Sequence, residues 1–433
     1  MLVLSFFPDN LTTISKSELQ KFKMSDKPAT ALPGHLGNLT VEEEGKLQEA
    51  WVHLLRLCGV EESVKLETPN RTNEFREQLS DKSADIFRYR LWTFILADHP
   101  DVLVLRFLRA RKWDVEKAVA MLVSALNWRH ERHLEDDIVH KGDSVGLAEA
   151  QSADEKSFIS QYQSGKAYIR GSDREGRPVF IIKVRLHDPK LQSPESMESF
   201  VLHNIETIRT MIRHPNEKSC LLFDLTGFGL KNMDFHVVRF LVQVFEARYP
   251  EYLGVVLVHN APFVFWGLSH FSPQLIWNAL VLMAYNAGIW KMIQPWLDPV
   301  IASKINFTSS NKDLARFVAQ ENLQKCYGGQ DSWEYKYIEP VQGEDARMGS
   351  EKKQQVEADR TVLLRQFEQL SLEWAQLKPD SSDAMRKVAE RRELADQLRE
   401  NYWHLDPFVR ARTCYDRAGV INALGEVDYK AAK

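Results

Sequence analysis

The fold is decided by residues 220–259, which read CLLFDLTGFGLKNMDFHVVRFLVQVFEARYPEYLGVVLVH. The runs at 220–225 and 254–259 are short, β-branched and almost wholly apolar, which is typical of strands covered on both faces. A helix is predicted between them over residues 235–248. Its inward-facing residues are Val238, Leu241, Val244 and Phe245. A strand, a helix and a strand at this spacing predict a right-handed βαβ unit, so we expect the middle of the chain to be α/β.

Similar runs on the N-terminal side extend this core. Residues 177–184, RPVFIIKV, predict a third strand of the same apolar kind. Further upstream, Asp101 is expected to cap a helix over 102–111, and a second helix follows over 115–129. The second helix carries one apolar stripe, made of Val115, Val119, Leu122 and Leu126.

Composition and periodicity divide the chain into four parts. They are a flexible N-terminal tail, a helical lobe, an α/β domain and a helical C-terminal extension, over residues 1–40, 41–150, 151–340 and 341–433. A capping box of Thr40 and Glu43 opens the lobe, and the polar residues 59–84 predict an inserted loop. Residues 351–403 favour two helices, broken at 378–382, that pack on the body of the protein.

The composition excludes several classes of protein. The 433 residues carry 56 basic and 60 acidic side chains, which is not the basic excess of a nucleic-acid-binding chain. The 4 cysteines form no C-x-x-C pair, so we expect neither a disulfide framework nor a zinc site. Such cysteines suit a reducing compartment. Residues 1–8 make a poor secretory signal, and the most apolar stretch, 275–290, is too short to span a bilayer. We therefore expect a cytoplasmic protein.

No standard catalytic motif is present. The sequence lacks a phosphate-binding loop, a dinucleotide-binding fingerprint, a zincin helix and a nucleophile elbow. His130 and His133 have the wrong spacing to present two metal ligands on one helical face. Asp224, at the end of a strand, is interpreted as a turn-capping carboxylate. We expect no catalytic residue, no metal and no cofactor, and interpret the chain as a non-enzyme.

Three motifs follow one another along the chain. In order they are LVLRFLRARKWD at 103–114, GSDREGRPVF at 171–180, and YPEYLG at 249–254 followed by VHNAPF at 258–263 and PWLDPVIASKI at 295–305. Three shorter stretches belong to the same set, ALPG at 31–34, GNL at 37–39 and ENLQKCYGG at 321–329. Together they resemble the CRAL-TRIO lipid-binding family, specifically its fungal phosphatidylinositol transfer proteins, over roughly residues 31–338.

The resemblance implies a helical lobe on an α/β domain whose sheet floors a deep apolar pocket, closed by a helical gate. In the phosphatidylinositol binders of this family an Arg, a Glu and a Lys hold the headgroup phosphate. The matching positions are Arg111, Glu251 and Lys304, with Ser303 beside the lysine. Arg offers a planar fork and Lys a point charge to a phosphodiester, and Glu251 would orient them or accept from inositol hydroxyls.

Two departures from the family pattern bear on the ligand. Ile301 stands where the family usually has Thr, which removes one hydroxyl contact, and FGLKN at 228–232 replaces a Ser-rich run associated with phosphatidylcholine. Choline-lipid binding is therefore not expected, and a second ligand would be a less polar lipid such as a sterol or squalene. The aromatic residues expected to line the pocket or gate are Phe263, Phe265, Trp266, Trp290 and Trp296.

An insertion interrupts the expected gate. Matched to the family, Trp266 should run almost directly into Gly288, yet about 21 residues, 268–288, intervene. Two hypotheses fit this segment, an enlarged gate or translated intron sequence. Transcripts that lack the segment would support the intron, and a tryptic peptide that spans it would exclude the intron. Membership of residues 1–23 in the mature protein is also open, since Met24 would serve as a start.

The sequence thus predicts a non-enzymatic lipid transfer or sensing protein with a role in phospholipid homeostasis. It would carry one phosphatidylinositol molecule and exchange it with a second lipid while transiently peripheral on membranes, such as endoplasmic reticulum, endosome or lipid droplet. The alternatives are a carrier of a sterol-like lipid, or a lipid-regulated adaptor that binds a protein partner through its C-terminal helices.

Overall fold

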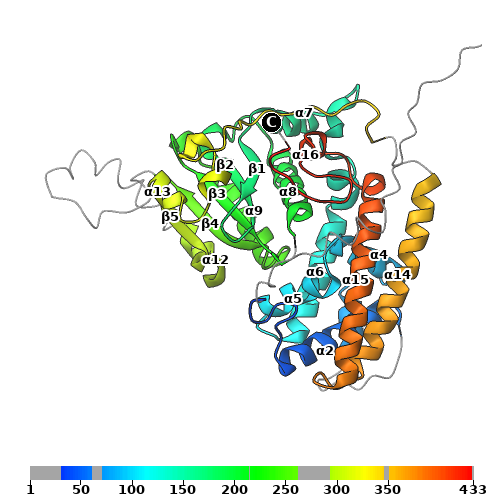
Figure 1. The fold of residues 1–433 in the computed structure, drawn as a ribbon. Helices are drawn as coiled ribbons and strands as arrows, with labels where there is room; N and C mark the ends of the chain where they lie inside the picture. Colours follow the sequence, from blue (N-terminus) through cyan, green and yellow to red (C-terminus); the bar gives the residue numbers. More distant parts are fainter. Residues whose placement is uncertain (1–30, 61–70, 214, 262–292, 346–350, 432–433) are drawn as a thin grey trace, which may run out of the picture.

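The computed structural model describes residues 31–60, 71–213, 215–261, 293–345 and 351–431. Figure 1 shows an α/β part built on one sheet, a helical lobe beside it, and two long C-terminal helices along that lobe. The segments 1–23 and 268–288 lie outside the described residues, as do four of the predicted pocket or gate residues. Those four are Phe263, Phe265, Trp266 and Trp290.

One sheet of five strands, in the order β1-β2-β3-β4-β5, forms the centre of the α/β part. Strand β1 pairs antiparallel with β2, whereas β2, β3, β4 and β5 run parallel to one another. The strands span Ala167–Ser172, Pro178–Lys183, Ser219–Asp224, Leu253–His259 and Ile305–Thr308. The three strands predicted from apolar runs are confirmed as β2, β3 and β4, because buried parallel strands carry apolar residues on both faces.

Both faces of the sheet are covered, which explains the unbroken apolar runs. On one face Val179, Leu222 and Leu257 pack against the chain that follows β5, including Leu314 and Tyr327. The opposite face turns toward helices α8 and α9 and carries the lining of an apolar pocket. These helices span Pro194–Met211 and Phe235–Ala247.

Five helices form the N-terminal lobe, α2 to α6. They span Val41–Leu57, Thr72–Glu77, Ala84–Ile95, Pro100–Ala110 and Val115–Glu131. The predicted capping box is confirmed, because Thr40 and Glu43 exchange side-chain and backbone hydrogen bonds at the start of α2. The stripe predicted on α6 is buried throughout. The predicted loop at 59–84 was wrong in part, since it contains α3, whose Phe75 is buried in the core.

The predicted cap of α5 was also wrong. The helix begins at Pro100, and the imidazole of His99 accepts the hydrogen bond of the Asp101 backbone N–H at 3.2 Å. The Asp101 carboxylate is buried instead, where it accepts from Trp51 Nε1 at 2.7 Å and pairs with Arg391 Nη1 at 2.8 Å. The acid therefore joins α5 to a helix near the end of the chain.

Short elements connect the lobe to the sheet and complete the α/β part. They are η1 Leu134–Val139, η2 Gly142–Leu147, α7 Ala153–Gln163, η3 Val184–Leu186, η4 Leu230–Asn232, η7 Gln294–Trp296, α12 Pro299–Ser303, α13 Asn311–Leu314, η8 Gln320–Asn322 and η9 Lys325–Tyr327. The turn after β3 confirms the interpretation of Asp224, whose carboxylate accepts from the Thr226 N–H at 2.9 Å.

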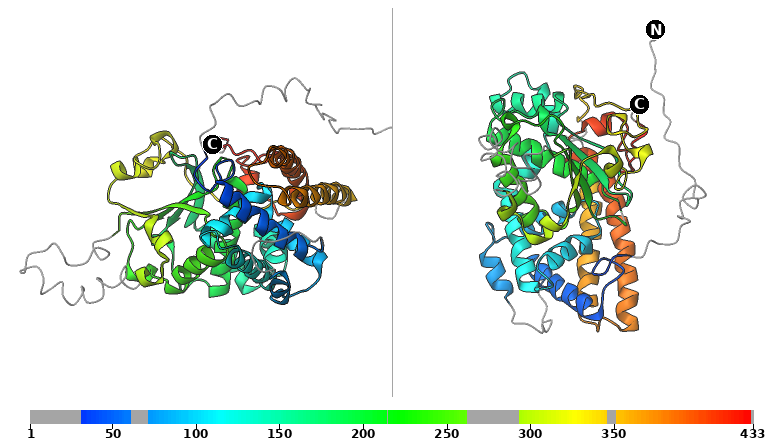
Figure 2. Two further views of the ribbon diagram at one scale, coloured as in Figure 1. Left: turned by 90° about the horizontal axis from the view of Figure 1, so that it is seen from below. Right: turned by 90° about the vertical axis from the view of Figure 1, so that its left-hand side faces the viewer.

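The two C-terminal helices pack on the helical lobe, as predicted. Helices α14 and α15 span Glu351–Ala375 and Ser382–Val409 and run side by side in both views (Figures 1 and 2). Glu368 of α14 is buried and accepts from Arg88 Nε at 2.9 Å and Trp92 Nε1 at 3.0 Å. Because buried charges of the lobe and of these helices, such as Arg88 and Glu368, pair with one another, the two parts stabilise each other.

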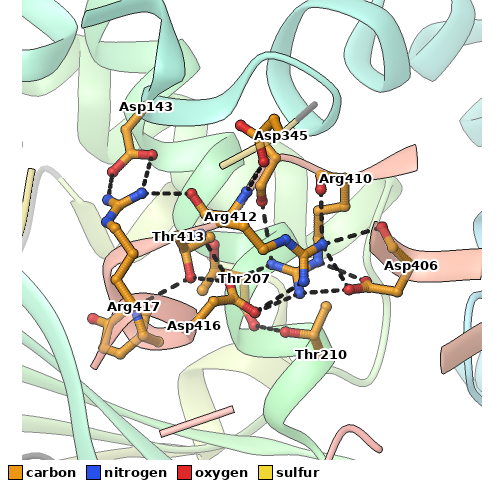
Figure 3. Close-up of polar contacts among 12 residues, drawn as sticks. Asp143, Thr207, Thr210, Asp345, Asp406, Arg410, Arg412, Thr413, Asp416 and Arg417 are labelled. Atoms are coloured by element: carbon orange, nitrogen blue, oxygen red, sulfur yellow. Dashed lines mark hydrogen bonds and ion pairs between the residues drawn. The ribbon is translucent and has the colours of Figure 1, made fainter. Parts of the chain in front are cut away.

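After α15 the chain turns back to the α/β part through a network of ion pairs (Figure 3). Arg410 is buried between Asp406 at 2.7 Å and Asp416 at 2.8 Å. Arg417, from α16 (Cys414–Arg417), pairs with Asp143 of η2. Each cation is matched by a carboxylate, so this network holds the chain in place and offers no free charge to a ligand.

The last described segment covers the outer edge of the sheet. Among the described residues no strand pairs with the outer side of β1, and there the backbone N–H of Ile169 donates to the Tyr415 hydroxyl at 2.6 Å. Arg170 reaches back to the carbonyl of Tyr429 and to the carboxylate of Asp331. A covered edge cannot pair with another chain, so the C-terminal segment protects the sheet from edge-to-edge association.

Candidate functional site

An apolar cavity lies between the sheet and helices α8 and α9. It encloses about 1550 Å³ when the space that opens to solvent at its mouth is included. Its floor is formed by alternate residues of the strands, including Phe180, Leu221, Val256, Val258 and Phe307. A concave apolar cavity of this kind is the usual form of a site for an apolar ligand.

The outer wall of the cavity comes from the helical stripe predicted on α9. Val238, Leu241 and Phe245 line the cavity and remain half-buried, whereas Val244 points into the core of the protein. A stripe of this kind is normally explained by core packing. Here Val238, Leu241 and Phe245 line the cavity. The apolar stripe on α9 was therefore predicted correctly, but most of it faces the cavity and not a packed core.

A cluster of charged residues stands at one edge of the sheet. Lys218, Glu251 and Lys304 lie directly before or within two residues of β3, β4 and β5. Because these strands are parallel, their amino ends meet at one edge. The Glu251 carboxylate bridges the two lysines, with Oε2 3.3 Å from Lys218 Nζ and Oε1 3.4 Å from Lys304 Nζ.

This cluster adjoins the apolar cavity along the chain. Leu253 lies two residues after Glu251 and lines the cavity. Ile301 and Ile305 flank Lys304 and line it as well. The charged edge therefore lies close along the chain to residues that line one end of the cavity.

Two arginines of the lobe extend the charged edge. Arg109 donates from Nη2 to Glu217 Oε2 at 2.8 Å and from Nη1 to the carbonyl of Gly34 at 2.9 Å. Arg106 is fully buried, lies 3.8 Å from the ring centre of Tyr252 and donates to the carbonyl of Glu217. Within the described residues, Arg106 Nε and Nη2 and Arg109 Nε are buried without a hydrogen-bond acceptor. Buried donors without partners are costly, so this edge favours an added anion.

Burial and neighbouring charges shift the pKa values of Glu251 and Lys304. Burial alone would raise the pKa of Glu251, but the charges of Lys304, Lys218 and Arg109 lower it below its usual range. Burial lowers the pKa of Lys304 even though Glu251 opposes that shift. Glu251 is therefore ionised, and its single negative charge is shared between Lys218 and Lys304.

The backbone at Glu251 is strained. Its φ angle is 63°, in the left-handed region that non-glycine residues rarely adopt. The backbone carbonyl of Glu251 lies 3.3 Å from Arg106 Nη1, which helps to hold this conformation. Strain of this kind is maintained where the surrounding structure fixes a side chain for a purpose, and here it aims the carboxylate between the two lysines.

Two of the four predicted headgroup residues come together, and two do not. Glu251 and Lys304 pair directly. Ser303 is exposed and donates to the carbonyl of Val300 at 2.7 Å. Among the described residues, Arg111 forms no ion pair, and its Nη1 donates to the carbonyl of Ala110 at 3.5 Å. The roles of Arg111 and Ser303 remain predictions.

The sequence analysis missed Arg106 and Arg109, although helix geometry could have pointed to them. Residues three apart on a helix share a face, so Arg106 and Arg109 of α5 point to the same edge of the sheet. Arg111 ends the helix two residues after Arg109 and lies on another face. The spacing of the three arginines carried this signal. Lys218 gave only the weaker signal of a basic residue directly before a strand.

Of the residues predicted to line the pocket or gate, Trp296 lies within the described parts of the chain. Ile301, which stands where the family usually has Thr, lies there as well. Trp296 packs edge-on against Phe235 at 6.1 Å between ring centres, and Arg239 lies 4.7 Å from the Trp296 ring centre. Leu297, the next residue, lines the cavity. Ile301 faces the cavity, so the residue that replaces the family's Thr extends the apolar lining.

In the described parts of the chain no group of three His, Cys, Asp or Glu side chains is arranged to hold a metal ion. Of the helices that the structure describes, none combines the length and the apolar content that crossing a bilayer requires.

Comparison with known proteins gives consistent matches. The CRAL/TRIO domain matches residues 162–278 and 284–329, and the CRAL/TRIO N-terminal domain matches residues 72–124. A CRAL-TRIO domain-containing protein of Schizosaccharomyces pombe is 36% identical over 77% of this chain and 68% of its own length. The protein named phosphatidylinositol transfer protein CSR1 of Eremothecium gossypii is 30% identical over 90% of this chain and 99% of its own. The solved structure of Sfh5 has a TM-score of 0.41 at 15% identity, over 68% of this chain and 88% of that one.

Proposed function

Because the chain belongs to the CRAL-TRIO family of lipid-binding proteins, we propose that it binds one phosphatidylinositol molecule and transfers it between membranes without catalysing a reaction. The headgroup phosphate would lie on the charged edge of the sheet, and the acyl chains would fill the apolar cavity. The similarity to a protein named as a phosphatidylinositol transfer protein supports this assignment.

The observation that carries the proposal is the excess of positive charge beside an apolar cavity. Four cations, Arg106, Arg109, Lys218 and Lys304, face three carboxylates, Asp98, Glu217 and Glu251, within the described residues. A phosphodiester beside Lys218 and Lys304 would add the missing negative charge. Glu251 would then be free to accept hydrogen bonds from inositol hydroxyls.

The cavity would supply what transfer requires energetically. A diacyl lipid exposes on the order of 30 methylenes, and each costs about 0.8 kcal/mol in water. A carrier must replace the bilayer with an equivalent apolar surface, and the cavity lining supplies that surface. We place the protein in the cytoplasm, transiently bound to membrane surfaces. All four cysteines, Cys58, Cys220, Cys326 and Cys414, are free thiols, which suits a reducing compartment.

The carrier is favoured over the adaptor by the position of the C-terminal helices. One face of α14 and α15 is occupied by the helical lobe through buried ion pairs such as Arg391–Asp101. That packing gives these helices a structural role, whereas a concave apolar cavity is the usual form of a site for an apolar ligand. A protein partner on the outer face of the two helices would be a further property of a lipid carrier.

The direct test is mass spectrometry of lipids that co-purify with the full chain under native conditions. We expect phosphatidylinositol in near-stoichiometric amount, and any second lipid would be identified in the same spectrum. A protein that carries no phospholipid, or only a sterol-like lipid, would contradict the headgroup assignment.

We expect Lys304→Ala to lower phosphatidylinositol loading at least about tenfold, because a hydrogen bond to a charged group contributes about 1.5–3 kcal/mol. Loading is measured by quantitative lipid analysis after incubation with vesicles that contain phosphatidylinositol. The matched control is Lys312→Ala, an exposed lysine of α13 outside the cluster, which should load normally.

The predicted role of Arg111 is tested in the same assay. Arg111→Ala should also reduce loading, and Arg392→Ala, at an exposed position on α15, should not. Normal loading by both Lys304→Ala and Arg111→Ala would refute the headgroup site.

A further inference from the structure

A second charged group lies inside the apolar cavity, away from the cluster already described. Lys166 directly precedes β1, is only 4% exposed and lines the cavity. Its backbone carbonyl accepts from the Lys183 N–H at 2.7 Å, which fixes the start of β1 against the end of β2. Lysine is rarely buried to this degree without an acidic partner.

The partners of the Lys166 ammonium carry no negative charge and are distant. Its Nζ lies 3.3 Å from His187 Nδ1, 3.3 Å from Gln192 Oε1 and 3.6 Å from the Met197 sulfur. The usual N–H···O distance is about 2.7–3.2 Å. Among the described residues no carboxylate lies within ion-pair distance of Lys166. A buried cation without a counter-ion is destabilising, and a ligand that brings one would relieve that cost.

The orientation of His187 is fixed by its other contacts. Its Nε2 lies 3.0 Å from Asp234 Oδ2, and its backbone carbonyl accepts from Asn232 Nδ2 at 2.7 Å. The Asp234 carboxylate accepts a hydrogen bond from Nε2–H, which leaves Nδ1 as the ring atom that faces Lys166. Asp234 is therefore committed to His187 and to the start of α9, where it accepts from the Val237 N–H.

The ammonium remains charged at neutral pH. Burial lowers the pKa of Lys166 to about 8, and the carboxylate of Asp234 opposes that shift. The ring centre of Phe200 lies 5.4 Å from Nζ, and the Met197 side chain lies beside it. A buried ammonium in a largely apolar lining is complementary to a ligand with one negative charge and a long apolar chain.

The strand directions place Lys166 at the opposite end of the cavity from the headgroup cluster. Because β1 is antiparallel to β2, Lys166 lies beside Lys183, at the carboxyl end of β2. Glu251 and Lys304 precede the amino ends of β4 and β5, which run parallel to β2. A strand of seven residues such as β4 is about 20 Å long. The two charged groups therefore serve different ligand groups.

We propose that the cavity takes a second ligand, a long-chain carboxylate of the fatty-acid type, whose carboxylate pairs with Lys166 while its chain occupies the apolar lining. A phosphate monoester carries more charge than one lysine can neutralise here, and a neutral lipid leaves the ammonium without a counter-ion. The inference rests on the proposed function only in that the cavity holds lipid.

The test compares palmitate with methyl palmitate, which has the same acyl chain and no charge, by titration calorimetry on the full chain. Wild-type protein should bind palmitate at least about tenfold more tightly than the ester. Lys166→Met should remove that preference by weakening palmitate alone, and Lys166→Arg should retain most of it. The matched control is Lys190→Met, an exposed lysine outside the cavity lining, and it should leave the preference unchanged.

The outcomes separate this inference from the proposed function. Equal binding of palmitate and ester by wild-type protein would overturn the role of Lys166, as would a preference that survives in Lys166→Met. Unchanged ester binding by Lys166→Met shows that this variant is folded. A protein that loads phosphatidylinositol but neither palmitate nor its ester would overturn the inference and leave the proposed function intact. A protein that binds none of the three would contradict both.

Discussion

Val258→Trp is expected to abolish lipid loading. Val258 lies on β4, is half-buried, and lines the floor of the cavity beside Phe223 and Phe307 of the neighbouring strands. An indole at this position would extend into the space that we assign to acyl chains, because side chains on this face of β4 point from the sheet into the cavity. Co-purified lipid should fall below about a tenth of the wild-type amount, for phosphatidylinositol and for any second lipid alike, since both would need the displaced volume.

The control for this prediction is Val258→Ile, which adds one methylene and should load normally. Thermal unfolding should show that the tryptophan variant is folded, because the added ring enters an existing cavity rather than a packed core. A folded tryptophan variant with full lipid loading would show that acyl chains lie elsewhere in the protein.

The second large effect concerns stability. Asp101→Ala should lower the free energy of unfolding by about 3–5 kcal/mol, because it leaves Arg391 buried without its counter-ion. Arg391 is 1% exposed and pairs with Asp101 at 2.5 Å, and Asp101 also accepts from Trp51. The measurement is urea denaturation followed by tryptophan fluorescence, which reports on Trp51 in the same core.

A matched exposed pair serves as the control. Asp396 and Arg399 of α15 form a 2.8 Å ion pair in which both side chains are about half exposed, at 58% and 51%. Exposed pairs contribute only about 0–1 kcal/mol, so Asp396→Ala should leave the unfolding midpoint nearly unchanged. Equal, small effects of the two substitutions would show that the C-terminal helices are not held by the buried pair.

The same pair predicts the direction of a pH effect. Burial alone would raise the pKa of Asp101, but Arg391 lowers it below its usual range. An acid whose pKa is lower in the folded state stabilises the fold above its unfolded pKa of about 3.9 and loses that contribution as the pH falls below it. We therefore expect the difference in stability between wild-type protein and Asp101→Ala to shrink in acid, as measured by denaturation across that range.

Local patterns accounted for most of the secondary structure. The apolar runs of β2, β3 and β4, the stripe on α6 and the box at Thr40 each depend on residues a few positions apart. Strand β5 has only four residues, Ile305–Thr308, which is too short for such a pattern to be seen. The helix α3 escaped prediction because its six residues, Thr72–Glu77, lie in a polar stretch and bury little besides Phe75.

The candidate site was predicted only in part. Resemblance to the family pointed to Glu251 and Lys304, which the structure brings together across 53 residues of sequence. It did not point to Arg109 or Lys218. Helical spacing could have placed Arg109 on the face of Arg106, but only the packing of α5 on the sheet brings Arg109 and Lys218 close to Glu251. Lys166 was also missed, because a lysine before a strand is ordinarily exposed and only the structure shows that it is buried.

The sequence by itself therefore determined the α/β core, the helical lobe, the paired C-terminal helices and the family. These follow from hydrophobic periodicity and ordered motifs, which act over short distances along the chain. Only the tertiary structure decided which charges meet. Asp101 pairs with Arg391 from 290 residues away, and Lys166 lies opposite the headgroup cluster because β1 runs antiparallel to its neighbour. Such contacts depend on how whole elements pack, and the free energy of a buried charge is set by the partners that packing brings to it.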